Sequence, residues 1–418
     1  ANSPLHDRNL GKRAVEQFME QEAQLTLPDF SDTEQTFKHL EDSDLLRINL
    51  LFKLMGNTGL TNVLSGVGAW AVRNGMPLAE WGVKKTIFQQ FVGGTSLIMA
   101  QPAIKNLHKY GVTSILDFGA EAKNSEQDYN NFMKEVLGAI EFSAEAPAAI
   151  AVVVKITGLA PDEMLENLNG ATVDFGGDDH AQFQATLRRL DAICGQAAKR
   201  DVQVYIDAEE SWMQNTIDQL ANKMMARYNQ ERVIVLNTYQ LYRHDRLDFL
   251  MQSHERARRE GYLLGAKLVR GAYMLKERAR AEEKGYPSPI QPTLEATHNA
   301  FNTAVRFCAD NVNTIACCIG SHNEDSVRLM TELIVERKIP RNHPHVQFAQ
   351  LLGMSDNLTF NLAGGGYNVS KYMVYGPVKE VLPYLIRRAE ENGSVTGELG
   401  RERKLIKQEI KRRKDIEK

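Results

Sequence analysis

The chain has 418 residues, more than the roughly 250–300 that one hydrophobic core usually accommodates, so we expect a large enzyme-sized domain with an accessory segment. With 43% hydrophobic residues, 25% charged residues and a formal net charge of -3, it has an ordinary globular composition and no general attraction for nucleic acid. Its longest apolar run, residues 148–154, is far too short to cross a bilayer, which takes about 20 residues.

The N-terminus and the cysteines bear on the compartment. Residues 1–15 contain no apolar signal core, and the absence of an initial Met suggests processing or trimming, with a removed transit peptide left open. The cysteines show neither paired spacing nor metal-ligand spacing, which indicates a reduced compartment. They are Cys194, Cys308, Cys317 and Cys318.

Residues 1–110 are dominated by helix-period patterns such as HLEDSDLLRINLLFKLMG, interrupted by Gly56, Gly59 and Gly66. This pattern predicts a helical arm or cap. The rhythm then changes to short β-branched runs separated by long amphipathic stretches, which is typical of βα units. We therefore expect a catalytic domain over residues 111–395 and a basic C-terminal helix over residues 396–418.

Eight apolar runs predict strands, and each leads into a stretch long enough to hold a helix. They cover residues 113–118, 149–156, 202–207, 232–237, 264–269, 314–320, 345–350 and 370–375. Eight βα units in about 280 residues predict a (β/α)8 barrel, whose typical size is about 250 residues. A doubly wound sheet is the alternative, but no glycine-rich phosphate turn follows the first strand.

Active sites of such barrels lie at the carboxyl ends of the strands, so polar residues there come first. Lys155 closes the apolar run AVVVKITG, where an ammonium group needs a partner anion or ligand unless it snorkels to solvent. Asp207 ends VQVYIDAEES and could serve function, or cap the next helix. Gln240, after the fourth run, can offer a donor and an acceptor to a planar ring.

The segment KLVRGAY ends the fifth run with Lys267 and Arg270, followed by Gly271. Two cations next to a glycine, which lets a ligand approach the backbone closely, suit an anionic cofactor better than a core.

After the sixth run, GSHNED places Ser321, His322 and Asn323 ahead of a predicted helix, whose N-terminus would face the barrel mouth. The histidine could instead be a plain helix cap. Metal binding is not expected, because no HExxH pattern or second nearby His with a carboxylate completes a metal shell.

Near the C-terminus, PYLIRRAEEN places Arg387 and Arg388 four and three residues before Glu391, within ion-pair reach on a helix. Two guanidinium groups in a turn leading from the last strand would attract a small carboxylate, because arginine grips both oxygens. The alternative is a solvated charged face.

These motifs, together with QLLGM and YGPVKEVLPYLIRRAEEN, resemble the proline dehydrogenase family, especially its monofunctional, mitochondrial-type members, in the family's order over about residues 110–415. FVGG and YGVTSILDFGAE also resemble it. The resemblance implies a distorted (β/α)8 barrel that binds FAD without a covalent bond and oxidises L-proline. Reduced FAD would pass its electrons to a membrane quinone.

The resemblance also implies residue roles. Lys155, Asp207 and Lys267 would be the catalytic residues. The proline site would comprise Lys155, Tyr273, Leu351, Tyr372, Arg387, Arg388 and Glu391. The FAD site would comprise Asp207, Ala208, Gln240, Lys267, Arg270, Gly271, Ala272, Ser321, His322 and Asn323. Lys267 is the residue of mitochondrial-type members, where bacterial members often have Arg.

Three other functions remain open at this point. The first is hydroxyproline oxidation, disfavoured because the ring of Tyr372 should crowd a C4 hydroxyl. The second is a barrel lyase that uses Lys155 as a Schiff-base amine. The third is a catalytically silent barrel that acts as a binding module.

The last 18 residues carry nine Lys or Arg against four acidic residues, which allows peripheral contact with an anionic membrane, although a basic terminal helix is often simply solvated. The resemblance implies the mitochondrial matrix or inner membrane in a eukaryote, and otherwise a bacterial cytoplasm with peripheral membrane association.

Overall fold

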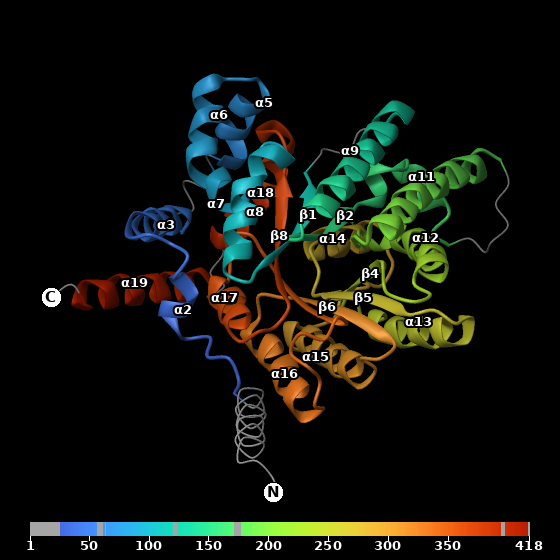
Figure 1. The fold of residues 1–418 in the computed structure, drawn as a ribbon. Helices are drawn as coiled ribbons and strands as arrows, with labels where there is room; N and C mark the ends of the chain where they lie inside the picture. The colour runs from blue at the N-terminus through green and yellow to red at the C-terminus, as the bar shows by residue number, and fades with distance from the viewer. Residues whose placement is uncertain are drawn as a thin grey trace, which may run out of the picture.

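In the computed structural model, which describes residues 26–56, 62, 64–119, 124–170, 177–393 and 398–416, eight parallel strands close into a barrel in chain order (Figure 1). The strands are β1 Thr113–Phe118, β2 Ala149–Val154, β3 Gln203–Ile206, β4 Val235–Gln240, β5 Leu264–Val269, β6 Ile315–Gly320, β7 Val346–Leu351 and β8 Val369–Tyr375. The predicted (β/α)8 barrel is confirmed, and β1 pairs with β8 to close it.

The fourth strand begins three residues later than the sequence predicted. The side chain of Asn229 accepts hydrogen bonds from the backbone N–H groups of Ile234 and Val235, each at 2.9 Å. A side chain therefore satisfies the backbone donors where β4 starts. The strand then continues to Gln240, which pairs with Val269 of β5. Gln240 is thus the last residue of β4 and not a loop residue.

Alternation along the strands decides which side chains line the barrel interior. Ile115, Val153 and Tyr205 belong to one buried interior cluster. Because strand side chains alternate between faces, the residues two positions further on return to the same face. Asp117 and Asp207 are two such residues, at the carboxyl ends of β1 and β3.

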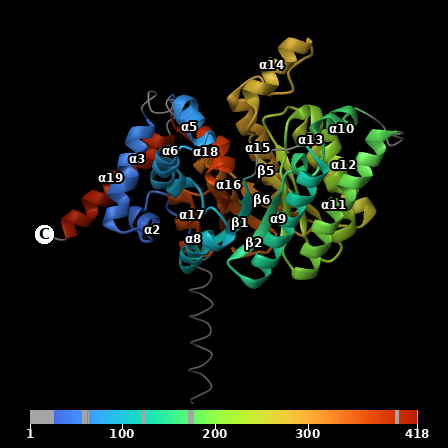
Figure 2. The same cartoon turned by 90° about the horizontal axis from the view of Figure 1, so that it is seen from above.

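The barrel helices alternate with the strands, and most of them bury their apolar faces against the outside of the sheet in one large cluster, whereas the last of them belongs to a second cluster. They are α9 Glu126–Glu145, α10 Asp162–Asn167, α11 Asp178–Arg200, α12 Ser211–Tyr228, α13 Arg246–Glu260, α14 Met274–Lys284, α15 Leu294–Asp310, α16 Glu324–Glu336, α17 Asp356–Gly364 and α18 Val378–Gly393, with a 3-10 turn at Ile156–Gly158. In the view from above, α14 projects from the remainder of the barrel (Figure 2).

The N-terminal region is helical, as the sequence predicted, over the residues that the structure describes; residues 1–25 of the predicted arm lie outside them. Its elements are α2 Thr33–Phe37, α3 Asp42–Met55, π-helix Leu64–Gly68, α5 Ala69–Arg73, α6 Pro77–Val83, π-helix Lys84–Phe88, α7 Gln89–Phe91 and α8 Leu97–Lys109. Buried side chains from α3 to α7 share a second core cluster with α18 (Figure 1). Helix α8 instead packs Ala100, Ile104 and Leu107 into the barrel cluster.

The basic C-terminal helix α19, Glu398–Ile416, lies beside α2 and α3 (Figure 1). Leu405 and Ile406 are buried in the cluster shared with α3 and α18. Glu409 is fully buried and pairs with Arg412 and Arg413, both at 2.8 Å. Two of the basic residues therefore hold the helix together and do not face solvent freely. Throughout the described residues, no helix combines the length and apolarity needed to cross a membrane.

Candidate active site

The carboxyl ends of β1, β2, β3, β5 and β8 bring five polar side chains together, which we call the mouth cluster: Asp117, Lys155, Asp207, Lys267 and Tyr372. Lys155 Nζ lies 3.1 Å from Asp117 Oδ2 and 3.0 Å from Asp207 Oδ2. Lys267 Nζ donates to Asp207 Oδ1 on the other side. Asp207 therefore joins the two lysines, and the cluster alternates cation and anion.

The charges of the mouth cluster fix one another. Burial disfavours the charged form of Lys155, but the carboxylates of Asp117 and Asp207 outweigh burial and raise its pKa. Burial would also raise the pKa of Asp207, but Lys267 and Lys155 hold it below its usual range. Burial dominates for Asp117, whose pKa is raised despite Lys155. Lys155 is thus a permanently charged ammonium group, and its side chain remains 35% exposed.

Tyr372 of β8 is locked in the same cluster. Its hydroxyl donates toward both carboxylate oxygens of Asp207, each at 2.9 Å. Lys267 Nζ lies 4.8 Å from the centre of its ring, a cation–π contact. Burial, with Asp207 as the second cause, raises the pKa of Tyr372 far above its ordinary value, so the phenol stays neutral. The ring therefore presents a fixed apolar wall.

The residues expected at the cofactor follow one another along the ends of β3 to β6. Gln240 is 3% exposed; its Nε2 donates to the Glu209 carbonyl at 2.9 Å, and its Oε1 accepts from Ala272 N at 3.3 Å. Arg270 donates to Ser321 Oγ at 3.0 Å and lies 4.3 Å from the ring centre of Phe301.

Gly271 adopts a φ of +148°, and a Cβ there would lie 2.4 Å from the ring of Tyr242. No side chain fits at this position, because the ring of Tyr242 lies where the Cβ would be; Gly271 and Ala272 are themselves exposed. The glycine is thus required by the packing of Tyr242, and its approach to a cofactor stays a prediction.

His322, which follows β6, contacts the end of β7 and the segment that follows it. Its Nε2 accepts from the backbone N–H of Leu351 at 3.3 Å, and its Nδ1 lies 2.8 Å from Ser355 Oγ. Burial, aided by Lys371 and Arg388, lowers the pKa of His322 to about 3, so the ring is neutral near pH 7. Asn323 caps α16 by accepting from Ser326 N at 3.0 Å.

Arg387 and Arg388 lie inside α18 and not in a turn, because a buried apolar stripe that includes Val381 and Leu385 continues the helix through them. Arg388 is buried, and its Nη2 lies 2.6 Å from Glu391 Oε1, the pairing that the sequence spacing predicted. Arg387, one residue earlier, is exposed. One of the two guanidinium groups is therefore buried, and the other is accessible to solvent.

Two further predicted residues lie at the same end of the barrel. Tyr273 precedes α14, and burial, with the nearby Glu209 and Glu210, raises its pKa while Lys155 opposes that shift. Ala208 is half-buried in the segment between Asp207 and α12.

Two acidic residues of the site were missed by the sequence reasoning. Asp117 interrupts the apolar run TSILDF as Lys155 interrupts the next one, so the same signal of a charge in a buried strand could have found it. Glu209 is 5% exposed and accepts from Thr157 Oγ1 at 2.5 Å; burial raises its pKa to about 7. Glu210 beside it is also buried, and nothing in the segment AEES signalled that its two carboxylates would be buried.

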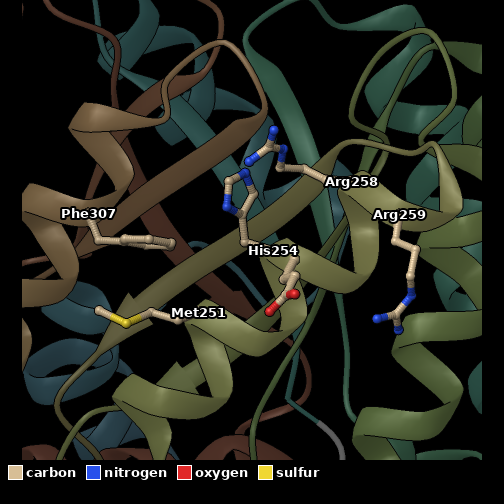
Figure 3. A pocket seen from close by; sticks show the side chains of 6 residues that line it. Met251, His254, Arg258, Arg259 and Phe307 are labelled. Atoms are coloured by element: carbon tan, nitrogen blue, oxygen red, sulfur yellow. The ribbon is translucent and has the colours of Figure 1, made fainter.

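A surface cavity of about 560 Å³ lies elsewhere, between α13 and α15 (Figure 3). Its lining residues are Met251, His254, Glu255, Arg258, Arg259 and Phe307. His254 Nε2 is 2.8 Å from Oγ1 of Thr314, the residue just before β6. The cavity is therefore at the amino-terminal edge of the strands, opposite the mouth cluster. None of its lining residues is a predicted site residue.

The mouth fits an anionic, planar cofactor. Lys267 and Arg270 supply cations, the N-terminus of α16 supplies free N–H groups, and Gly271 leaves room for contact with the backbone. Gln240 keeps one amide hydrogen and one lone pair beyond its two protein bonds. FAD offers the phosphates and the ring with polar edges that such a donor set matches. Within the described part of the chain, no three His, Cys, Asp or Glu side chains are grouped to hold a metal ion.

The fold and the mouth cluster together define a (β/α)8-barrel protein with a charged candidate ligand site at the strand ends. A family model described as Proline dehydrogenase matches residues 100–401, and the chain belongs to the proline dehydrogenase family. It is 33% identical over 374 residues to proline dehydrogenase 1, mitochondrial, of Dictyostelium discoideum, covering 79% of this chain and 65% of that protein.

Other similarities agree with this membership. The chain is 40% identical over 259 residues to human proline dehydrogenase 1, mitochondrial, covering 61% of this chain and 43% of that protein. It is 33% identical over 374 residues to the hydroxyproline dehydrogenase of Xenopus laevis, covering 81% of this chain and 80% of that protein. The chain thus spans less than two thirds of the length of these two proline dehydrogenases.

Among solved structures, proline utilization A from Bdellovibrio bacteriovorus, inactivated by N-propargylglycine, resembles the chain with a TM-score of 0.68. The match has 20% sequence identity and covers 84% of this chain and 38% of that one. At this identity the likeness supports the barrel fold alone.

Proposed function

We propose that the protein is an FAD-dependent dehydrogenase that oxidises L-proline to Δ1-pyrroline-5-carboxylate, the first step of proline catabolism. The observation that carries the proposal is the charge balance of the site. Lys155, Lys267 and Arg388 pair with three carboxylates, Asp117, Asp207 and Glu391, and the exposed Arg387 leaves one formal positive charge. A substrate with a carboxylate and a neutral amine matches that charge.

Each residue then has a task. Lys155, fixed by two carboxylates, and Arg388, fixed by Glu391, bind the carboxylate of proline together with Arg387. The locked ring of Tyr372 and the side chains of Tyr273 and Leu351 pack against the pyrrolidine. Bound FAD supplies the hydride acceptor, at flavin N5, that no protein side chain can provide. Because proline is held at one end, its C5–H can be aimed at the cofactor, and orientation is most of the catalytic task.

The positive pocket also favours the neutral amine of proline, because like charge disfavours the ammonium form. We therefore expect kcat/KM to rise from neutral toward alkaline pH as the amine of free proline loses its proton. A profile that is flat over this range would contradict the proposal.

On the cofactor side, Gln240 and Lys267 are proposed to contact the flavin, with Asp207 and Ala208 beside it. Arg270, Gly271, Ala272, Ser321, His322 and Asn323 are proposed to hold the remainder of FAD. Arg270 supports this role because His298, Ser321 and Ser326 orient its guanidinium group toward the ends of β5 and β6.

The decisive experiment is the visible absorption spectrum of the purified protein before and after anaerobic addition of L-proline. We expect flavin bands that bleach with proline, which would establish cofactor and substrate together. A protein without flavin that stays unresponsive after FAD is supplied would overturn the proposal. D-proline, which has the same charges in the opposite configuration, is the matched control and should leave the bands unchanged.

The geometry disfavours a Schiff-base lyase, because Asp117 and Asp207 raise the pKa of Lys155, whereas a nucleophilic amine must lose its proton. Borohydride should therefore trap no adduct on Lys155. Hydroxyproline is disfavoured because the hydrogen bond from Tyr372 to Asp207 prevents the ring from swinging away from a C4 hydroxyl. Turnover of trans-4-hydroxy-L-proline comparable to that of L-proline would reverse this choice.

Electrons are proposed to leave reduced FAD for a membrane quinone, which requires peripheral contact with a membrane; in a eukaryotic cell this would be the mitochondrial inner membrane on its matrix side. The helical arm supports such contact. Leu46, Leu50 and Leu54 form an exposed stripe on α3, and Trp70 and Trp81 are exposed on α5 and α6. Helix α19, which contacts α3, adds four basic side chains that line an open surface cavity of about 430 Å³: Arg403, Lys404, Lys407 and Lys411. Basic residues next to exposed apolar side chains favour contact with an anionic membrane.

Co-sedimentation with vesicles tests this contact. The wild-type protein should bind vesicles that contain phosphatidylserine, and the double substitution Trp70→Ser with Trp81→Ser should lower the bound fraction several-fold. Leu294→Ser, at an exposed apolar residue of the barrel, is the control and should bind like wild type. Equal binding of all three proteins would exclude the arm as the contact.

A further inference from the structure

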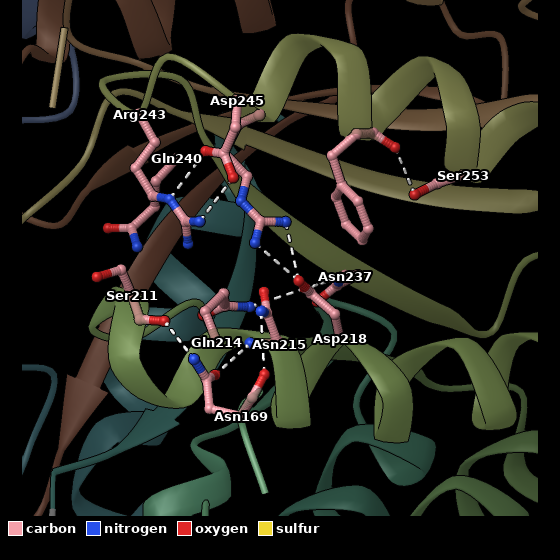
Figure 4. A network of polar contacts seen from close by, with 12 residues as sticks. Asn169, Ser211, Gln214, Asn215, Asp218, Asn237, Gln240, Arg243, Asp245 and Ser253 are labelled. Carbon is pink, nitrogen blue, oxygen red and sulfur yellow. Dashed lines mark hydrogen bonds and ion pairs between the residues drawn. The ribbon is translucent and has the colours of Figure 1, made fainter. Parts of the chain in front are cut away.

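A second buried polar network lies behind the cofactor side, between α12, α13 and β4 (Figure 4). We call it the outer cluster: Gln214, Asp218, Asn237 and Arg246. Both terminal nitrogens of Arg246 lie 2.8 Å from Asp218 Oδ2. Asn237 Nδ2 and Gln214 Nε2 each lie 2.9 Å from Asp218 Oδ1. Asp218 therefore accepts four hydrogen bonds, and no residue of the cluster is more than 4% exposed.

The carboxylate determines which way the Gln214 amide points. An ionised carboxylate only accepts hydrogen bonds, so Gln214 must turn its NH₂ group toward Asp218 and its carbonyl oxygen away. That oxygen then accepts from the backbone N–H of Glu209 at 2.8 Å. The carboxylate of Asp218 thus orients the Gln214 amide so that its oxygen accepts from Glu209, in the segment that follows β3.

The Glu209 residue is held from three directions. Gln214 accepts from its N–H, Gln240 donates to its carbonyl at 2.9 Å, and its side chain accepts from Thr157. The segment that contains it connects Asp207 of the mouth cluster to α12. Gln240 Oε1 in turn accepts a hydrogen bond from Ala272 N at 3.3 Å. The contacts expected at the cofactor on β3, β4 and β5 are therefore joined through one residue, Glu209.

We propose that Gln214, oriented by Asp218 and Arg246, is a positioning residue for cofactor binding. It touches neither FAD nor proline; it holds the backbone of Glu209 so that Gln240 presents its remaining amide hydrogen and lone pair to the flavin. The inference rests on the proposed use of FAD. It adds a residue whose role the site contacts alone do not reveal.

The substitution Gln214→Met tests the inference, because methionine keeps the length of the side chain but can neither donate to Asp218 nor accept from Glu209. Asp218 retains Arg246 and Asn237, so the ion pair survives. We expect the dissociation constant of FAD, measured by quenching of flavin fluorescence on titration with apoprotein, to rise about tenfold, the effect of one buried hydrogen bond left unmade. Thermal stability is measured in parallel.

Gln230→Met is the matched control, because Gln230 is exposed just after α12 and its Nε2 donates only to the local Ala226 carbonyl at 2.7 Å. Its FAD affinity should equal that of wild type. If Gln214→Met does not fold, Gln214→Asn decides, since a shorter amide can stay beside Asp218 but cannot also reach the Glu209 N–H; it should weaken FAD affinity to a similar extent.

The outcomes separate the two proposals. A Gln214 variant that loses stability but binds FAD within twofold of wild type would overturn the positioning role and leave the proposed function intact. Wild-type protein that takes up no FAD would overturn the proposed function itself. Weaker FAD affinity in Gln214→Met, with an unchanged affinity in Gln230→Met, supports the inference.

Discussion

The mouth cluster and the outer cluster use the same chemistry in two environments. Each joins an Asp to a cation and to neutral hydrogen-bond donors, at the carboxyl end of the strands and behind β4 respectively. In the outer cluster the side chains of Arg246 and Asp218 are only 3% and 5% exposed. In the mouth cluster Lys155 is 35% exposed and Asp207 17%. A closed ion pair serves the fold, whereas an accessible cation of fixed charge can also bind a ligand.

The largest expected effect is that of Asp207→Ala, which removes the carboxylate shared by Lys155, Lys267 and Tyr372. We expect a loss of about 3–5 kcal/mol in the free energy of unfolding, because buried cations lose their counter-charge. Proline-dependent reduction of an acceptor dye should fall at least about 100-fold, since the reacting groups lose their geometry. Asp310→Ala, at an exposed pair with Arg337, should cost at most about 1 kcal/mol in urea denaturation.

Arg246→Met tests the outer cluster in the same way, because it removes the counter-charge of Asp218. Asp218 would remain buried with two amide donors but without a counter-charge, so we expect a loss of about 3 kcal/mol in the free energy of unfolding. With saturating FAD, kcat for proline should stay within about threefold of wild type, because no group that contacts the substrate is changed. A loss of kcat as large as that of Asp207→Ala would mean that the two clusters do not differ in role.

Lys155→Met removes the accessible cation. We expect kcat/KM for L-proline to fall about 100-fold, which is about 2.7 kcal/mol of lost transition-state stabilisation, with FAD still bound. The flavin absorption spectrum distinguishes this result from loss of the cofactor. Activity near that of wild type would show that Arg387 and Arg388 bind the carboxylate without Lys155.

The low pKa of His322 predicts how acid affects stability. Its pKa is about 3 in the folded protein and ordinarily 6.5, so between these values the unfolded chain binds the additional proton. The contribution of neutral His322 is complete above pH 6.5 and is lost as the pH falls, by up to about 1.4 kcal/mol per pH unit. Urea denaturation at pH 7, 6 and 5 should therefore show a steeper acid loss for wild type than for His322→Asn. Parallel curves would contradict the shift.

The smallest expected effect is that of Tyr372→Phe, which removes the bond to Asp207 but keeps the ring. We expect a loss of about 1 kcal/mol in stability and a decrease of a few-fold in kcat/KM for proline. Tyr372→Ser, which removes the ring, should instead raise the ratio of activity on trans-4-hydroxy-L-proline to that on L-proline. Steady-state kinetics with both substrates measures the change.

Local patterns were sufficient for the barrel itself. Seven of the eight strands start within one residue of their predicted positions, because buried parallel strands are continuous apolar runs that local sequence reveals. The fourth was displaced because Asn229, a residue of the preceding turn, satisfies backbone donors at its start. Hydrophobic periodicity does not reveal where a side chain, here that of Asn229, replaces a neighbouring strand as the hydrogen-bond acceptor of the backbone.

Charged residues near the ends of three apolar runs were enough to predict that Lys155, Asp207 and Lys267 meet at one edge of a sheet. The pairing of Arg388 with Glu391 followed from helix spacing. Three features depend on the tertiary structure: Asp117 pairs with Lys155, Arg388 is buried while Arg387 is exposed, and Asp218 orients Gln214 behind the site. These contacts join residues far apart in the chain, and their energies depend on burial, which no local pattern encodes.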